Sequence, residues 1–207
     1  MKISYAITVC NEFKEIQRLL QFLLQNKRHH DEIVILYDEE HGDREIENFL
    51  RAQSINGGFI WHKGKFENHF ADWKNKLTDL CTGDYIFQID ADEIPSEYLI
   101  QNLPILLEHN SSVELYAVPR VNTVDGVTDK HIQNWRWTVN ENGWVNWPDF
   151  QTRIYKNLPE IKWKNKVHER LEGHKQFAYL PMEEEWALYH PKTIERQERQ
   201  NKYYDTL

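Results

Sequence analysis

Two aspartates, Asp90 and Asp92, stand where an apolar stretch of the sequence ends in acidic residues. Residues 85–89 have the pattern of a buried strand, and side chains two positions apart on an extended backbone point the same way. The two carboxylates are therefore expected side by side at a strand end, where they repel each other unless a cation lies between them. Oxygen ligands suit Mg²⁺ or Mn²⁺, which keep open positions for substrate phosphates. A solvated acidic turn is the alternative interpretation of the same spacing.

The elements before these aspartates alternate between strand and helix. Apolar runs and helical periodicity predict strands at residues 2–10, 32–37, 59–61 and 85–89, and helices at 12–24, 44–53 and 68–81. This order predicts an α/β fold with a mostly parallel central sheet flanked by helices. Right-handed crossovers place the carboxyl ends of the first, second and fourth strands at one edge, where ligands bind in such sheets. Strand ends are often polar in any case, so a binding crevice here is a hypothesis.

Residues 96–207 have a different character. We expect helices at 95–109 and 193–205, strands at 114–121, 151–156 and 167–169, and a turn at Asp125-Gly126. Four tryptophans, at positions 135, 137, 144 and 147, lie close together in the sequence. Aromatic faces stack on the apolar faces of sugar rings, and a small aromatic core is the alternative for at least two of them. No linker or repeat divides the chain, so a single domain over 1–207 is predicted.

Composition narrows the function classes. The chain has 207 residues and a formal net charge of −8, which argues against general nucleic-acid binding because that needs a basic footprint. The two cysteines, Cys10 and Cys81, match neither a disulfide framework nor a zinc site. No apolar run reaches membrane-spanning length, so no transmembrane segment is expected. The first strand begins at residue 2 without a signal peptide, and a cytoplasmic location is expected.

An ordered set of short motifs resembles the GT-A fold, family 2-type glycosyltransferases. In the first half these are ITVCNE (7–12), YD (37–38), WKN (73–75), TGDY (82–85) and IDADE (89–93). In the second half GW (143–144), WPDFQTRIY (147–155), VHE (167–169) and YH (189–190) resemble the branch that includes lipopolysaccharide-core glucosyltransferases. The sequence departs from the family in the loop at 38–42 and in residues 122–142, so substrate identity is left open.

The resemblance implies a nucleotide-sugar-binding half at residues 1–95 and a smaller, mixed acceptor-side half at 96–207. Four residues near the ends of the first two strands would hold the base and ribose: Thr8, Asn11, Glu12 and Asp38. Lys74 and Asn75 would face the nucleotide from their helix. Asp90 would lie near the ribose and the metal, and Asp92 would ligate Mn²⁺ or Mg²⁺ bridging the diphosphate.

Candidates for the remaining chemistry come from the second half. An acceptor hydroxyl is a poor nucleophile and needs a base; Asp149 is our candidate, with a capping aspartate as the alternative role. Glu93 is a rival base that we expect to stabilise its loop instead. Arg153 would contact the diphosphate or form an ion pair within the fold. His168 and His190 are each candidate ligands of phosphate or metal, or structural histidines.

These residues together predict a metal-dependent inverting glycosyltransferase. It would transfer a sugar from a nucleoside-diphosphate donor, UDP-linked by expectation, to a hydroxyl of a glycan or glycoconjugate acceptor. A nucleotidyltransferase that forms nucleotide-sugars is one alternative, but residues 10–13 (CNEF) lack the glycine-rich basic loop it would need. A non-catalytic carbohydrate-binding domain that uses the tryptophans is the other.

Overall fold

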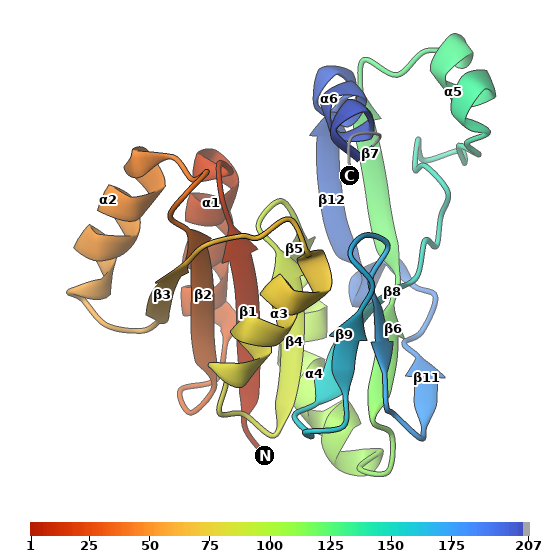
Figure 1. Cartoon of the computed structure of the whole chain (residues 1–207). Helices are drawn as coiled ribbons and strands as arrows, with labels where there is room; N and C mark the ends of the chain where they lie inside the picture. The colour runs from red at the N-terminus through yellow and green to blue at the C-terminus, as the bar shows by residue number, and fades with distance from the viewer. Residues whose placement is uncertain (205–207) are drawn as a thin grey trace.

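Strands and helices alternate through the first half of the chain in the predicted order (Figure 1). The computed structural model describes residues 1–204. The first four strands are β1 (Ile3–Val9), β2 (Glu32–Asp38), β3 (Ile60–Gly64) and β4 (Tyr85–Asp90). The helices between them are α1 (Phe13–Asn26), α2 (Arg44–Ser54) and α3 (Phe70–Asp79). β1 pairs in parallel with β2 and β4, and β2 pairs in parallel with β3.

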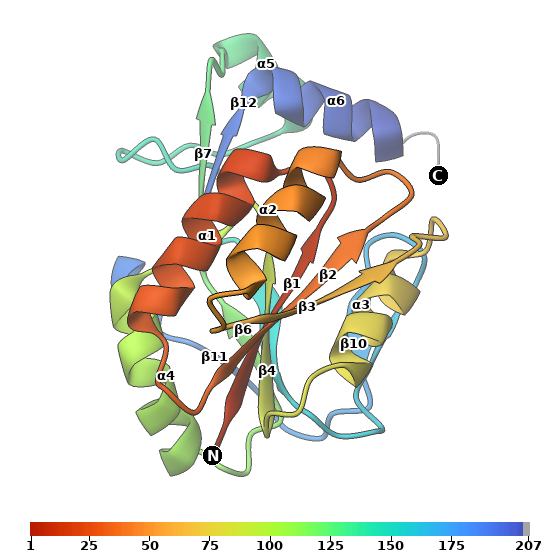
Figure 2. The same ribbon diagram turned by 90° about the vertical axis from the view of Figure 1, so that its left-hand side faces the viewer.

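The alternation of side chains along β1 decides how the helices pack. Ile3, Tyr5 and Ile7 belong to the core shared with α1 and α2, whereas Ala6 belongs to the core shared with α3. Figure 2 shows α1 and α2 against one face of the sheet and α3 at the other. Both faces are covered, which is why the strands carry nearly continuous apolar runs.

The second half extends the same sheet beyond β4. It adds β6 (Leu115–Val118), β8 (Gln151–Lys156) and β11 (Phe177–Tyr179), giving the order β11-β6-β8-β4-β1-β2-β3. Because β8 runs antiparallel to both β4 and β6, the sheet is mixed on this side. α4 (Glu97–His109) adds to the core beside α1 and begins at Ser96, whose side chain accepts a hydrogen bond from the Leu99 amide. The α/β fold with a mostly parallel central sheet is confirmed.

Two small sheets and three further helical segments complete the second half. One sheet has the order β5 (Ile94–Pro95), β12 (Leu188–Thr193) and β7 (Arg120–Asp125), and the other pairs β9 (Lys162–Lys164) with β10 (Arg170–Glu172). The helical segments are α5 (Asp129–Trp135), the single-turn η1 (Glu184–Trp186) and α6 (Ile194–Tyr204). Figure 1 shows β7 and β12 extending past the central sheet, with α6 at their far end.

Two of the predicted strands are wrong. The strand expected at 114–121 is broken at Pro119, because β6 before it belongs to the central sheet and β7 after it pairs with β12. Residues 167–169 lie in the connection between β9 and β10, where His168 has a φ of 52° that an extended strand excludes. α5 was not predicted. The C-terminal helix is present, but Asp205, its predicted last residue, lies outside the described residues.

Within residues 1–204, none of the helices combines the length and the apolar character that crossing a membrane requires. The expected cytoplasmic location stays a prediction.

Candidate active site

A cavity of about 970 Å³ opens at the carboxyl ends of β1, β2 and β4. Thr8, Asn11 and Asp38, which were predicted to hold the base and ribose, line it on one side. Residues from β7, β8, β12 and α6 line the opposite side, including Asn122, Arg153, His190 and Arg196. Side chains from both halves of the sequence thus meet in one space, where a parallel sheet is expected to bind its ligand.

The strand-end carboxylates on the donor side are tied to the backbone. Glu12 also lines the cavity, and its Oε2 accepts hydrogen bonds from the amides of Cys10 and Asn11, both at 3.0 Å. Burial raises the pKa of Glu12. Asp38 is buried; its Oδ1 accepts from the Glu40 amide at 3.1 Å, and its Oδ2 lies 2.9 Å from Nδ1 of His41. These bonds fix the ends of β1 and β2 around the cavity.

Two neighbouring residues of α3 have separate roles. Lys74 lines the cavity, pairs with Glu169, and holds its Nζ 4.6 Å from the ring centroid of Trp163. Asn75 is not among the lining residues; its amide donates to the Trp163 carbonyl at 3.0 Å and accepts from the Trp163 amide at 2.9 Å. The structure therefore brings Lys74 to the site, while Asn75 joins α3 to β9.

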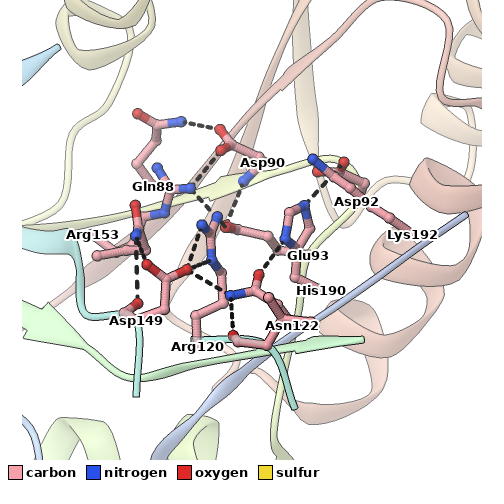
Figure 3. Close-up of polar contacts among 12 residues, drawn as sticks. Gln88, Asp90, Asp92, Glu93, Arg120, Asn122, Asp149, Arg153, His190 and Lys192 are labelled. Atoms are coloured by element: carbon pink, nitrogen blue, oxygen red, sulfur yellow. Dashed lines mark hydrogen bonds and ion pairs between the residues drawn. The ribbon is translucent and has the colours of Figure 1, made fainter. Parts of the chain in front are cut away.

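Glu93 is the centre of a buried ion-pair network (Figure 3). Its carboxylate is fully buried and accepts hydrogen bonds from Arg120 at 3.0 Å, from Arg153 at 2.7 Å and from the Asp90 amide at 3.1 Å. Asp90 pairs with the same Arg153 guanidinium at 2.5 Å. Burial opposes ionisation of Asp90, but the charges of Arg153 and Lys74 outweigh it and lower its pKa to about 2. Glu93 thus holds two arginines together and does not line the cavity, which fits the predicted stabilising role better than the rival role of base.

Asp149 lies at the other end of this network, beside the cavity. Its Oδ2 accepts from Arg120 Nη2 at 2.7 Å and from Asn122 Nδ2 at 2.7 Å, and its Oδ1 accepts from Gln151 at 3.0 Å. Burial opposes ionisation, but Arg120, Asn122 and Gln151 together lower the pKa of Asp149. Asp149 directly follows the cis Trp147–Pro148 bond and has a φ of 35°. A non-glycine residue keeps such a left-handed backbone only when its surroundings stabilise it.

Asp92 and His190 lie next to each other in the cavity lining (Figure 3). His190 Nε2 lies 3.3 Å from Asp92 Oδ2, and Arg196 Nη2 lies 3.4 Å from the same oxygen. Burial opposes ionisation of Asp92, but the bond to His190 and the nearby charges lower its pKa. Burial lowers the pKa of His190.

The described side chains supply only part of the ligands that a divalent metal ion needs. Among residues 1–204, no three His, Cys, Asp or Glu side chains are grouped as a metal site. Asp92 and His190 offer two converging donors, whereas Asp90 faces Arg153. Two protein ligands fit Mg²⁺ or Mn²⁺ when substrate phosphates supply the others. His168, the last predicted ligand, lines the cavity from the connection between β9 and β10.

The cavity residues that sequence reasoning did not single out include Arg120, Asn122, Lys192 and Arg196. Arg120 and Asn122 sit on β7, which enters the stretch that matched no family motif, and their partners are distant in sequence. Arg196 pairs with Glu15 at 2.8 Å and lies 3.6 Å from Glu12. The arginine-rich character of the C-terminal helix was visible in the sequence and was the one signal for its role.

Comparison with known proteins gives one family and one fold. The family model described as glycosyl transferase family 2 matches residues 4–174. No curated protein sequence matches the chain. S. aureus TarS superposes with a TM-score of 0.62 and 12% identity over 92% of this chain and 37% of that one. TarS 1–349 in complex with UDP superposes with a TM-score of 0.62 and 12% identity, over 92% of this chain and 60% of that one. Its complex with UDP-GlcNAc superposes with a TM-score of 0.59 and 12% identity, over 93% of this chain and 59% of that one. The chain thus spans at most 60% of the length of these three TarS structures.

Proposed function

The chain belongs to glycosyl transferase family 2 and is a glycosyltransferase of GT-A fold, and we propose that it transfers a sugar from a nucleoside-diphosphate-sugar to a glycan hydroxyl. The observation that carries the proposal is the network of Asp90, Arg153, Glu93, Arg120 and Asp149, which joins both sides of one cavity. The family match favours this reading over a nucleotidyltransferase or a non-catalytic carbohydrate-binding domain.

UDP is the nucleotide that we assign to the donor. TarS, which shares the fold, was solved with UDP and with UDP-GlcNAc. In this chain the base and ribose would lie near Thr8, Asn11 and Asp38, which line the cavity at the ends of β1 and β2. Lys74 lies on the same side.

Asp92 and His190 are the residues that would hold Mn²⁺ or Mg²⁺, because both line the cavity and their donor atoms lie 3.3 Å apart. When bound, such an ion would neutralise the negative charge that grows on the leaving diphosphate. Lys192 and Arg196 add positive charge to the same wall of the cavity. Arg196 already lies 3.4 Å from Asp92, so it is placed to balance an anion bound there.

Asp149 is the proposed base. Its lowered pKa keeps it ionised at neutral pH, and three of its hydrogen bonds go to Oδ2. Oδ1, which accepts from Gln151, retains lone-pair capacity for the acceptor's hydroxyl proton. A single base on this fold favours direct displacement with inversion, without a covalent intermediate, and this is the mechanism we propose.

Thermal unfolding with a panel of nucleoside diphosphates, each with Mn²⁺, Mg²⁺ or EDTA, tests the donor site. A ligand at about one hundred times its dissociation constant adds roughly 2.7 kcal/mol to the folded state. We expect UDP with a divalent ion to raise the melting temperature, and Asp92→Ala to abolish that rise. Asp79→Ala, which removes an exposed carboxylate of α3, should leave it unchanged. If no nucleotide moves the melting temperature under any condition, the proposed donor site is wrong.

A further inference from the structure

Asn122 lies between the proposed base and the proposed metal ligand, and no sequence motif singled it out. In the parallel pairing of β7 with β12, Asn122 is the register partner of His190, so their side chains lie next to each other on one face. Figure 3 shows its amide between Asp149 on one side and the imidazole on the other. The side chain is partly buried and lines the cavity.

Its hydrogen bonds leave a single orientation for the amide. The nitrogen Nδ2 lies 2.7 Å from Asp149 Oδ2 and 3.3 Å from the Val145 carbonyl oxygen. Asp149 is ionised, and neither a carboxylate nor a carbonyl can donate, so the NH₂ group must face them. The oxygen Oδ1 then faces His190 Nδ1 at 2.8 Å. Reversing the amide would set its oxygen against two acceptors, which excludes the other assignment.

This orientation decides which nitrogen of His190 carries a proton. An amide oxygen only accepts, and Asn122 Oδ1 lies 2.8 Å from Nδ1 whereas the competing acceptor, Asp92 Oδ2, lies 3.3 Å from Nε2. The shorter contact assigns the single proton of the neutral ring to Nδ1, which donates to Asn122. Nε2, which lies 3.3 Å from Asp92 Oδ2, is then the nitrogen with a lone pair available in the neutral ring. Partners that fix the tautomer of a ligand histidine are worth roughly 10- to 100-fold in metal affinity or activity.

We propose that Asn122 is a positioning residue that acts on two groups at once. Through Oδ1 it holds His190 with Nδ1 protonated, which presents Nε2 beside Asp92. Through Nδ2 it holds Asp149 and the backbone of Val145, another residue of the cavity lining. The effect on turnover rests on the proposed function, whereas the state of the imidazole does not.

Nitrogen-15 NMR of the imidazole in the metal-free protein tests the proposed effect of Asn122 on His190. A correlation spectrum at about pH 9, assigned with His190→Gln, identifies the protonated nitrogen. We expect Nδ1 of His190 to carry a proton in the wild type. Asn122→Leu should move the proton to Nε2, which can donate to Asp92. An Nδ1 without a proton in the wild type overturns the inference, as does a leucine variant with the wild-type spectrum.

Asn122→Asp tests the proposed effect of Asn122 on Asp149. It also serves if the leucine variant fails to fold. An aspartate has the same shape and can still accept from His190 Nδ1, but it cannot donate to Asp149 and repels it. The proton should therefore remain on Nδ1 while kcat falls about 10- to 100-fold, with little change in KM for the donor. Unchanged kcat overturns this half of the inference.

Asn157→Leu is the matched control. The Asn157 amide donates to the carbonyls of Cys81 and Gly83 at 3.2 and 3.1 Å, and it lies outside the cavity lining. It should lower stability without altering the His190 spectrum. If no transferase activity is found at all, the proposed function fails, yet the spectra of the wild type and the leucine variant still decide the inference.

Discussion

The two halves of the chain contribute to one cavity but are assembled differently. In residues 1–95, successive strands β1, β2 and β3 pair directly, and one helix separates each from the next. In residues 96–207, β8 inserts between β4 and β6, and β12 pairs with β7 although their site residues are 68 positions apart. The first half is thus built from repeated local units, whereas the second depends on register between distant segments.

The halves are joined by charge as well as by strands. Glu93 comes from the donor side, and the two arginines that it binds, Arg120 and Arg153, come from the acceptor side. Each arginine binds a second carboxylate, Asp149 or Asp90. One buried glutamate therefore links the proposed base, through Arg120, to the proposed donor side.

Removing that glutamate should have the largest effect. Glu93→Ala would leave the buried Arg153 and the partly buried Arg120 each short of a partner, and breaking a buried ion pair in this way costs about 3–5 kcal/mol. Urea unfolding would measure the loss. Glu97→Ala, at an exposed position of α4, should change stability by less than about 1 kcal/mol. Equal losses in the two variants would mean that the network does not join the halves.

Asp149→Asn should abolish most of the turnover while leaving UDP binding intact. The amide cannot take the acceptor's proton, so kcat should fall roughly 10²- to 10⁴-fold, while the UDP-dependent rise in melting temperature persists because the donor side is intact. Steady-state kinetics and thermal unfolding of the same sample check this. Asp125→Asn, exposed at the end of β7, is the matched control. A variant that keeps full kcat would exclude Asp149 as the base.

The same contrast explains what the sequence could and could not predict. The elements of residues 1–95 followed from periodicity, and Asp90 and Asp92 stood out by their spacing. The expectation that they point the same way was wrong, because β4 ends at Asp90 and the two carboxylates contact different partners, Arg153 and His190. Arg120 and Asn122 could not be found from spacing, since their roles depend on the register of β7 with β12. No local pattern reports a register between distant strands.

Predictions failed where the direction of a side chain or the geometry of a loop was needed. Lys74 and Asn75 were both expected to face the nucleotide, but consecutive helix residues point about 100° apart. Lys74 lines the cavity and Asn75 bonds to Trp163. His168 reaches the cavity from a loop rather than from the predicted strand, because its left-handed backbone ends the extended geometry.

Asn75→Ala sharpens that distinction. Losing two hydrogen bonds to the Trp163 backbone should cost about 1–2 kcal/mol, with no change in the UDP-dependent shift. Lys74→Met, its neighbour in the cavity lining, should reduce that shift. Calorimetric titration with UDP gives both affinities. If Asn75→Ala binds UDP more weakly than the wild type at the same folded fraction, Asn75 does contact the nucleotide.

The smallest expected effect comes from the opposite edge of the sheet, at the amino ends of the strands. Glu32 at the start of β2 accepts hydrogen bonds from Lys2 Nζ, Ser4 Oγ and the Thr82 amide, each at 2.6 Å. Burial alone would raise its pKa, but these bonds outweigh burial and lower the pKa from 4.5 to about 2. Because the folded-state pKa is depressed, the carboxylate contributes stability above about pH 4.5 that is lost as the pH falls towards 2.

Glu32→Gln should therefore cost about 1 kcal/mol at pH 7, a figure kept low because partly exposed ion pairs are screened by water. The difference from wild type should shrink towards zero as the pH approaches 2, which urea unfolding at pH 7, 4 and 2.5 would show. Glu160→Gln, an exposed residue, should differ from wild type by less than about 0.5 kcal/mol throughout. A constant difference for Glu32→Gln would mean that packing, not ionisation, is responsible. Since Glu32 lies outside the cavity lining, its loss should leave kcat unchanged, unlike the loss of any carboxylate in the network around Glu93.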